Sequence, residues 1–187
     1  MTPQLPTYDR TKLTPGIVHI GLGNFHRAHM AVYLDDLFGM GLSHDWAILG
    51  AGVRDGDARM REALKAQDCL STVIELDPNG KSARRVGSMI DFLPVEADNA
   101  ALIAAMSRPE IRIVSLTVTE GGYFINPATG QFDPTHPEIV ADAANPHRTA
   151  FGAIIAALKA RKAAGVAPFT VMSCDNLPGN GHVTKDA

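Results

Sequence analysis

The chain has 187 residues, a formal net charge of -3, 45% hydrophobic residues and 20% charged ones, which is typical of one folded domain with a buried core. It lacks the basic excess that nucleic acid binding requires. No apolar run approaches the ~20 residues of a membrane-spanning helix, and no apolar leader follows the first charges, so we expect a cytoplasmic protein without membrane contact. Its two cysteines, Cys69 and Cys174, exclude a four-cysteine metal site and are expected to be reduced thiols.

The order of hydrophobic segments predicts an α/β fold. Residues 1–15 contain three prolines and little periodicity, so we expect an extended lead-in to one domain at residues 16–187. Gly16–Gly21 predicts a buried strand, and the apolar spacing from Ala28 onward predicts one amphipathic helix. Further along, the same criteria predict a strand at 46–53, a helix at 57–67 capped by Asp57, a hairpin of 69–76 and 81–88, a helix near 98–106, a strand at 111–118, a long proline-rich loop at 119–147, a helix at 148–164 and a strand at 169–174. This alternation indicates a mostly parallel sheet covered on both faces, with an inserted antiparallel hairpin.

Ligands of open parallel sheets bind beyond the carboxyl ends of the strands, which makes four stretches informative. These stretches are residues 21–26, 52–57, 119–123 and 175–181. Each follows a predicted strand, so each is expected at the same edge of the sheet.

The first stretch contains the glycine spacing of a phosphate-binding turn. Gly21 and Gly23 occupy the first two glycine positions of the dinucleotide fingerprint, and His26 occupies the third. Amide N–H groups at the start of the following helix can bind an anion, and Arg27 can add a charge-assisted hydrogen bond. An ordinary structural turn is the alternative. A metal site at His26 and His29 is a weaker hypothesis, because no third ligand follows at zinc spacing.

The second stretch contains a candidate ribose ligand. Asp57 follows the second strand, where a carboxylate can accept hydrogen bonds from an adenosine ribose, although it could equally cap a helix. Arg54 and Arg59 lie nearby, and an arginine there can accommodate a 2′-phosphate. We therefore expect NAD in preference to NADP.

The third and fourth stretches are rich in glycine and polar residues. Two glycines follow Glu120 and allow the main chain to pass close to a flat ligand; Glu120 itself is either a pocket carboxylate or a solvated charge. Cys174 could act as a nucleophile only with His182 as its base, so a buried structural thiol is the preferred interpretation.

Three motifs in this order, GLGNFHRAH, VTEGGY and SCDNLPGNG, make residues Ile17–Thr184 resemble the polyol-specific long-chain dehydrogenases, the family of mannitol 2-dehydrogenase and fructuronate reductase. The resemblance implies a Rossmann-type, doubly wound domain that binds NAD(H), followed by a helical catalytic domain. It also implies an oxidoreductase that interconverts the secondary alcohol of a polyol or sugar acid with the matching ketone.

The resemblance also assigns roles by position. The residues that correspond to the pyrophosphate turn are Gly21, Gly23, Asn24, Phe25 and His26. Apart from the resemblance, we also expect coenzyme contacts from Arg27, Thr119 and Glu120, which lie in the first and third stretches. Asp57 corresponds to the carboxylate that favours NAD, although Gly56 stands where relatives can have a second acidic residue. Asn176 corresponds to an asparagine that donates to the reacting oxygen, which is the stabilisation a developing alkoxide needs.

One family pattern is absent from the sequence. The family's general base is a lysine in a Lys-x4-Asn-x2-His pattern, and no lysine from Lys12 to Lys185 begins it. We therefore expect the coenzyme half of an enzyme, without its helical C-terminal catalytic domain, that binds NAD with negligible turnover. The alternative is a catalytically silent module that binds a nucleotide or a partner.

Overall fold

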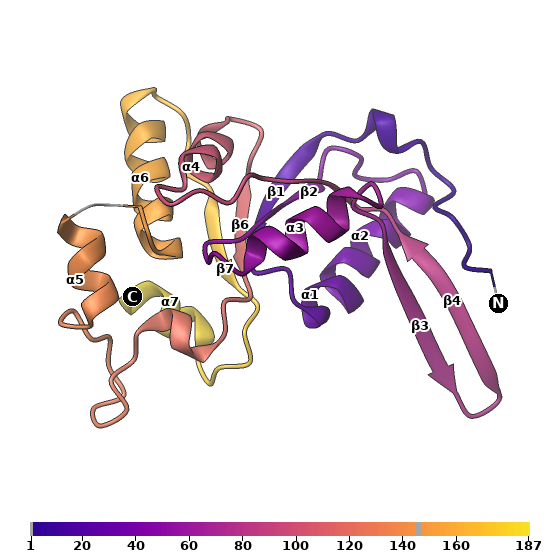
Figure 1. The fold of residues 1–187 in the computed structure, drawn as a ribbon. Coiled ribbons are helices and arrows are strands. Elements are labelled where there is room, and N and C mark those ends of the chain that lie inside the picture. Colours follow the sequence, from indigo (N-terminus) through magenta and orange to yellow (C-terminus); the bar gives the residue numbers. More distant parts are fainter. Residues whose placement is uncertain (1, 145–146) are drawn as a thin grey trace.

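The computed structural model describes residues 2–144 and 147–187 and contains a five-stranded sheet and a separate hairpin (Figure 1). The strand order of the sheet is β5-β2-β1-β6-β7, and its neighbouring strands are parallel. The bounds are β1 Pro15–Ile20, β2 Ala47–Ala51, β5 Met89–Phe92, β6 Ile113–Leu116 and β7 Thr170–Ser173. The chain proceeds from β1 outward to one edge and then from β6 to the other, which confirms the doubly wound α/β fold.

Helices cover both faces of this sheet because successive strand residues point to opposite sides. Val18 and Ile20 of β1 face a core shared with α4 and α6, whereas Ile17 faces a second core with α2 and α3. The helical elements are η1 Arg10–Lys12, α1 Asn24–Ala28, α2 Met30–Gly39, α3 Asp57–Lys65, α4 Ala100–Ser107, η2 Glu120–Tyr123, α5 Pro137–Ala144, α6 Ala150–Ala163 and α7 Asn180–Asp186. None of the described helices has the length and apolar content to cross a membrane.

The predicted hairpin is confirmed. Strands β3 (Ser71–Asp77) and β4 (Gly80–Val86) pair in antiparallel register, and the Asp77 carboxylate accepts a hydrogen bond from the Asn79 amide in the turn at 2.8 Å. The hairpin extends away from the main sheet (Figure 1). The lead-in lies against this region, since Gln4 pairs with Arg84 of β4.

The structure differs from the predicted elements in several places. The helix expected from Ala28 is α2, which begins at Met30, and a separate five-residue helix, α1, precedes it because the backbone breaks at His29 (φ -125°, ψ -88°). Strand β5 has only four residues and was assigned to no element, and α5 lies inside the segment expected to be an irregular loop. Asp57 is not a helix cap: the cap position belongs to Gly56, and Asp57 is the first helical residue.

Candidate functional site

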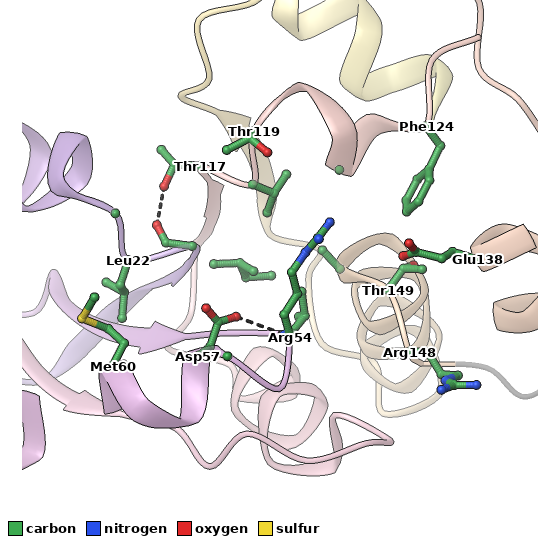
Figure 2. Close-up of a pocket in the computed structure, with 18 of the residues that line it drawn as sticks. Leu22, Arg54, Asp57, Met60, Thr117, Thr119, Phe124, Glu138, Arg148 and Thr149 are labelled. Carbon is green, nitrogen blue, oxygen red and sulfur yellow. Dashed lines mark hydrogen bonds between the residues drawn. The ribbon is translucent and has the colours of Figure 1, made fainter. Parts of the chain in front are cut away.

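A pocket of about 410 Å³ lies beyond the carboxyl ends of β1, β2 and β6, at the place where the strand order reverses. Its lining residues are Ile20, Gly21, Leu22, Gly23, Val53, Arg54, Gly56, Asp57, Met60, Phe92, Thr117, Val118, Thr119, Gly122, Phe124, Glu138, Arg148, Thr149 and Ala150. Figure 2 shows Leu22, Met60 and Asp57 on one side, with Phe124, Glu138 and Thr149 on the other and the Arg54 side chain between the two. Four of the nine predicted coenzyme-binding residues, Gly21, Gly23, Asp57 and Thr119, are brought together here.

The two glycines of the first turn are required for different reasons. Gly21 has φ +95°, and a Cβ atom there would overlap the carbonyl group of Thr117, so the fold itself requires glycine. Gly23 has an ordinary φ of -69°, and a Cβ atom there would meet nothing within 4 Å. A side chain would therefore meet no neighbour at Gly23, which is the N-cap of α1, and its bare backbone forms an open part of the pocket wall.

The Gly21 turn is held by polar side chains below it. The Thr117 hydroxyl donates to the Gly21 carbonyl oxygen, and the same oxygen lies 3.0 Å from Nε2 of His19 (Figure 2 draws the Thr117 bond). Because a carbonyl only accepts, Nε2 carries the proton, and Nδ1 accepts from the Ser115 hydroxyl at 2.7 Å. His19 and Thr117 were not among the predicted site residues; the one available signal was a histidine within an apolar strand.

His26 lies under the turn and does not line the pocket, contrary to our expectation. Its side chain is almost fully buried, with 2% exposed, and its ring stacks on the His19 ring at a centroid distance of 3.5 Å. Neither ring nitrogen has a hydrogen-bond partner among the described residues. Burial, reinforced by the positive charge of Arg27, lowers the pKa of His26 to about 4. His26 is therefore neutral at pH 7 and packs as an aromatic ring.

Arg27 and its neighbours also turn away from the pocket. The Arg27 guanidinium donates to the Leu22 carbonyl oxygen at 2.8 Å and to Oδ1 of Asn24 at 2.5 Å, so it braces the turn from outside. Phe25 is 56% exposed and contacts the His29 ring edge to face. His26 and His29 thus have different partners, and the described residues contain no group of three or more His, Cys, Asp or Glu side chains placed to hold a metal ion.

Asp57 lies in the pocket wall and stabilises the turn between β2 and α3. Its Oδ2 accepts a hydrogen bond from the Arg54 amide at 3.0 Å, the second dashed line in Figure 2. A Cβ atom on Gly52 would overlap the Asp57 side chain, so glycine at position 52 allows the carboxylate to approach the end of β2. The structure shows no protein donor to Asp57 Oδ1 among the described residues, which leaves that oxygen available to a ligand.

Glu120 and Asn176 line a second, smaller recess of about 360 Å³ together with Thr119, Gly121 and Asp175. Thr119 belongs to both cavities, so the recess is adjacent to the larger pocket. The Asn176 side chain is exposed there. The predicted oxyanion donor therefore lies beside the larger pocket, next to Thr119, and does not line it.

Cys174 has the environment of a structural thiol. It is half-buried, and burial, together with the negative charge of Asp175, raises the pKa of its thiol, which disfavours the thiolate. His182, its only candidate base, is exposed on α7. This environment supports the structural interpretation over the nucleophilic one.

The residues on the side of the pocket opposite Asp57 were not among the predicted site residues. Phe124, Glu138 and Thr149 come from the segment after η2, from α5 and from the start of α6. Asp142 of α5 accepts hydrogen bonds from the Thr149 amide and hydroxyl, which attaches α5 to α6. The length of the predicted loop was the only signal that this segment had a role.

Comparison with known proteins agrees with the geometry. Residues 15–187 match the family described as the mannitol dehydrogenase Rossmann domain. Mannitol 2-dehydrogenase of Cereibacter sphaeroides is 78% identical over 184 residues, which are 97% of this chain and 38% of that relative.

Two solved structures superimpose closely. The ternary complex of Pseudomonas fluorescens mannitol 2-dehydrogenase with NAD and D-mannitol matches with a TM-score of 0.92 and 49% identity over 98% of this chain and 38% of that one. A D-sorbitol dehydrogenase in substrate-free form matches with a TM-score of 0.91 and 44% identity over 98% of this chain and 39% of that one. The chain thus spans less than half the length of these relatives, and it belongs to the mannitol dehydrogenase family, whose Rossmann domain it contains.

Proposed function

We propose that this chain binds NAD(H) in the larger pocket and serves as the coenzyme domain of an oxidoreductase that acts on a polyol or a sugar acid. The observation that carries the proposal is the pair of glycines after β1: Gly21 is required by the fold, whereas Gly23, which lines the pocket, has no neighbour within 4 Å of a Cβ position and leaves its backbone open to a ligand. A relative of known structure forms a complex with NAD and D-mannitol.

The residues present fit a dinucleotide. The backbone at Gly23 and the start of α1 offers amide N–H groups to a pyrophosphate. Because α1 has only five residues before the break at His29, we attribute this binding to individual amides and assign little of it to a helix dipole. Asp57 Oδ1 would accept from a ribose hydroxyl, and its negative charge disfavours a 2′-phosphate, so NAD is preferred over NADP.

The other half of the proposal concerns chemistry. NAD supplies the hydride acceptor, and the Asn176 amide would donate a hydrogen bond to the reacting oxygen from the adjacent recess. No lysine lines the pocket or the recess among the described residues. We therefore propose that these residues bind coenzyme but do not oxidise a polyol alone, and that catalysis requires a helical domain like that expected from the family.

Calorimetric titration with NADH tests the coenzyme site. Gly23→Ala should weaken binding about tenfold or more, because a methyl group would occupy the space of the ligand, while the melting temperature stays unchanged. Gly181→Ala is the matched control, since Gly181 also has open space around it but lies outside the pocket. Equal affinities for wild type and Gly23→Ala would contradict the proposed site.

Coenzyme preference and turnover are measured on the same protein. Asp57→Asn should narrow the difference in affinity between NADH and NADPH, because it removes the charge that opposes a 2′-phosphate.

An assay of D-mannitol oxidation with NAD tests the proposed lack of turnover. Robust turnover by the 187-residue chain would show that a group of this chain accepts the hydroxyl proton.

A further inference from the structure

The carboxylate of Asp175, two residues after the end of β7, binds the segment that follows the neighbouring strand β6. Its Oδ1 accepts from the Thr119 amide at 3.0 Å, and its Oδ2 accepts from the Val118 amide at 3.0 Å and from the Tyr123 hydroxyl at 2.7 Å. Such charge-assisted hydrogen bonds are stronger than neutral ones. One side chain thus joins β7 to the segment that separates the pocket from the recess.

That segment has an unfavourable backbone conformation. Thr119 has φ +67° and ψ 167°, a region populated almost only by glycine, and Thr119 is β-branched. A conformation of this kind persists only where surrounding contacts hold it. The Asp175 carboxylate accepts from the amide of Thr119 itself and from the amide before it, so it is the contact placed to hold it.

The backbone of Asp175 is also fixed. The Asn180 side-chain amide donates to the carbonyl oxygens of Ser173 at 3.2 Å and of Asp175 at 3.3 Å. Asn176 follows directly and lines the recess with Thr119. The distance between Asn176 and the pocket wall therefore depends on how Asp175 is bound.

We propose that Asp175 is a positioning residue that holds the strained Val118–Thr119 turn against the coenzyme and thereby sets Asn176 relative to it. This inference rests on the proposed function. With the adenosine half at Asp57 beyond β2, the other half of a dinucleotide bound at the β1 turn lies on the β6 side, against Val118 and Thr119. We call the hydrogen bonds from the Val118 and Thr119 amides to the Asp175 carboxylate the clamp. Loss of the clamp should therefore weaken contacts with the nicotinamide end of the dinucleotide more than contacts with its adenosine end.

A stability cycle without ligand tests the clamp. Asp175→Asn replaces one acceptor oxygen by an NH₂ group that faces amide donors, so the melting temperature should fall. In a Thr119→Gly background the same substitution should cause a larger fall, because the threonine turn recovers part of the loss by relaxing its strained backbone, whereas glycine has no strain to release. Ser107→Ala, which removes a side-chain hydrogen bond to the Ile103 carbonyl oxygen in α4, is the control and should be additive with Thr119→Gly. Additivity of Asp175→Asn with Thr119→Gly would overturn the clamp.

Ligand titrations test the consequence for binding. Asp175→Asn should keep its affinity for ADP-ribose within about twofold of wild type but lose most of the change in nicotinamide fluorescence on binding NADH. The change should return in part in Asp175→Asn/Thr119→Gly, a rescue that a general loss of stability would not produce. A wild-type fluorescence change in Asp175→Asn would overturn this inference and leave the proposed function intact. Failure of the wild type to bind either ligand would overturn both.

Discussion

The turn after β1 and the segment after β7 both carry family motifs, but they are held in different ways. The β1 turn is fixed from within the sheet, by the overlap that excludes any Cβ at Gly21 and by hydrogen bonds from His19 and Thr117. The segment after β7 is fixed by Asp175 and ends in the exposed Asn176. The β1 turn is therefore held by several contacts within the sheet, whereas the segment after β7 is joined to the end of β6 through one carboxylate.

Gly21→Ala should have the largest effect and tests the claim that the β1 turn is held by packing. Alanine at φ +95° is strained, and its Cβ would overlap the Thr117 carbonyl, so we expect a loss of about 3 kcal/mol or more in the free energy of unfolding. Urea denaturation followed by circular dichroism measures this loss. Gly23→Ala in the same turn should change stability by less than about 0.5 kcal/mol, and similar losses for both variants would contradict the distinction between the two glycines.

The order of strands and helices could be predicted because it depends on local patterns. Continuous apolar runs identified β1, β2, β6 and β7, and the Asp-Pro-Asn-Gly turn identified the hairpin. Strand β5 was missed because its four residues resemble a continuation of the hairpin, and they form a strand only by pairing with β2. The separate helix α1 before His29 was missed because its five residues are too few to show a helical apolar spacing.

The site residues were predicted correctly where their position directly after a strand places them in the pocket. They were missed where the direction of a side chain depends on contacts with residues far away in the sequence. Gly21, Gly23 and Asp57 line the pocket because their places after the strands determine their positions. The direction of His26 depends on the ring of His19 on another element, which no spacing within the motif encodes. Asp175 shows the same limit, since its partners lie more than fifty residues earlier in the chain.

The stacked histidines should make the β1 region sensitive to acid. The pKa of His26 falls from 6.5 to about 4 on folding, and burial lowers the pKa of His19 well below 6.5. Between pH 6.5 and pH 4 these histidines are protonated in the unfolded chain but neutral in the folded protein. The free energy of unfolding is therefore highest above pH 6.5 and declines as the pH falls toward 4. The maximum slope for His26 is about 1.4 kcal/mol per pH unit.

Urea denaturation at pH 7, 6 and 5 measures this dependence, with His26→Phe as the matched variant. Phenylalanine preserves a stacked ring without a titrating group. As the pH falls, the unfolding free energy of the wild type should therefore decrease more than that of the variant. Carboxylates contribute equally to both proteins and cancel in the difference. A pH-independent difference would show that His26 does not carry the acid sensitivity.

Asn176→Ala should have the smallest effect, and it tests how the segment after β7 is held. The Asn176 side chain is exposed, so the free energy of unfolding should change by less than about 0.5 kcal/mol and the affinity for NADH should stay near that of wild type. Denaturation and calorimetric titration, run beside Asp175→Asn, measure both quantities. Because the two residues are adjacent, a large loss in Asp175→Asn with none in Asn176→Ala would place the support of this segment in the carboxylate alone. A comparable loss in both would instead mean that Asn176 itself helps to hold the segment after β7, and that this segment, like the β1 turn, is held by more than one residue.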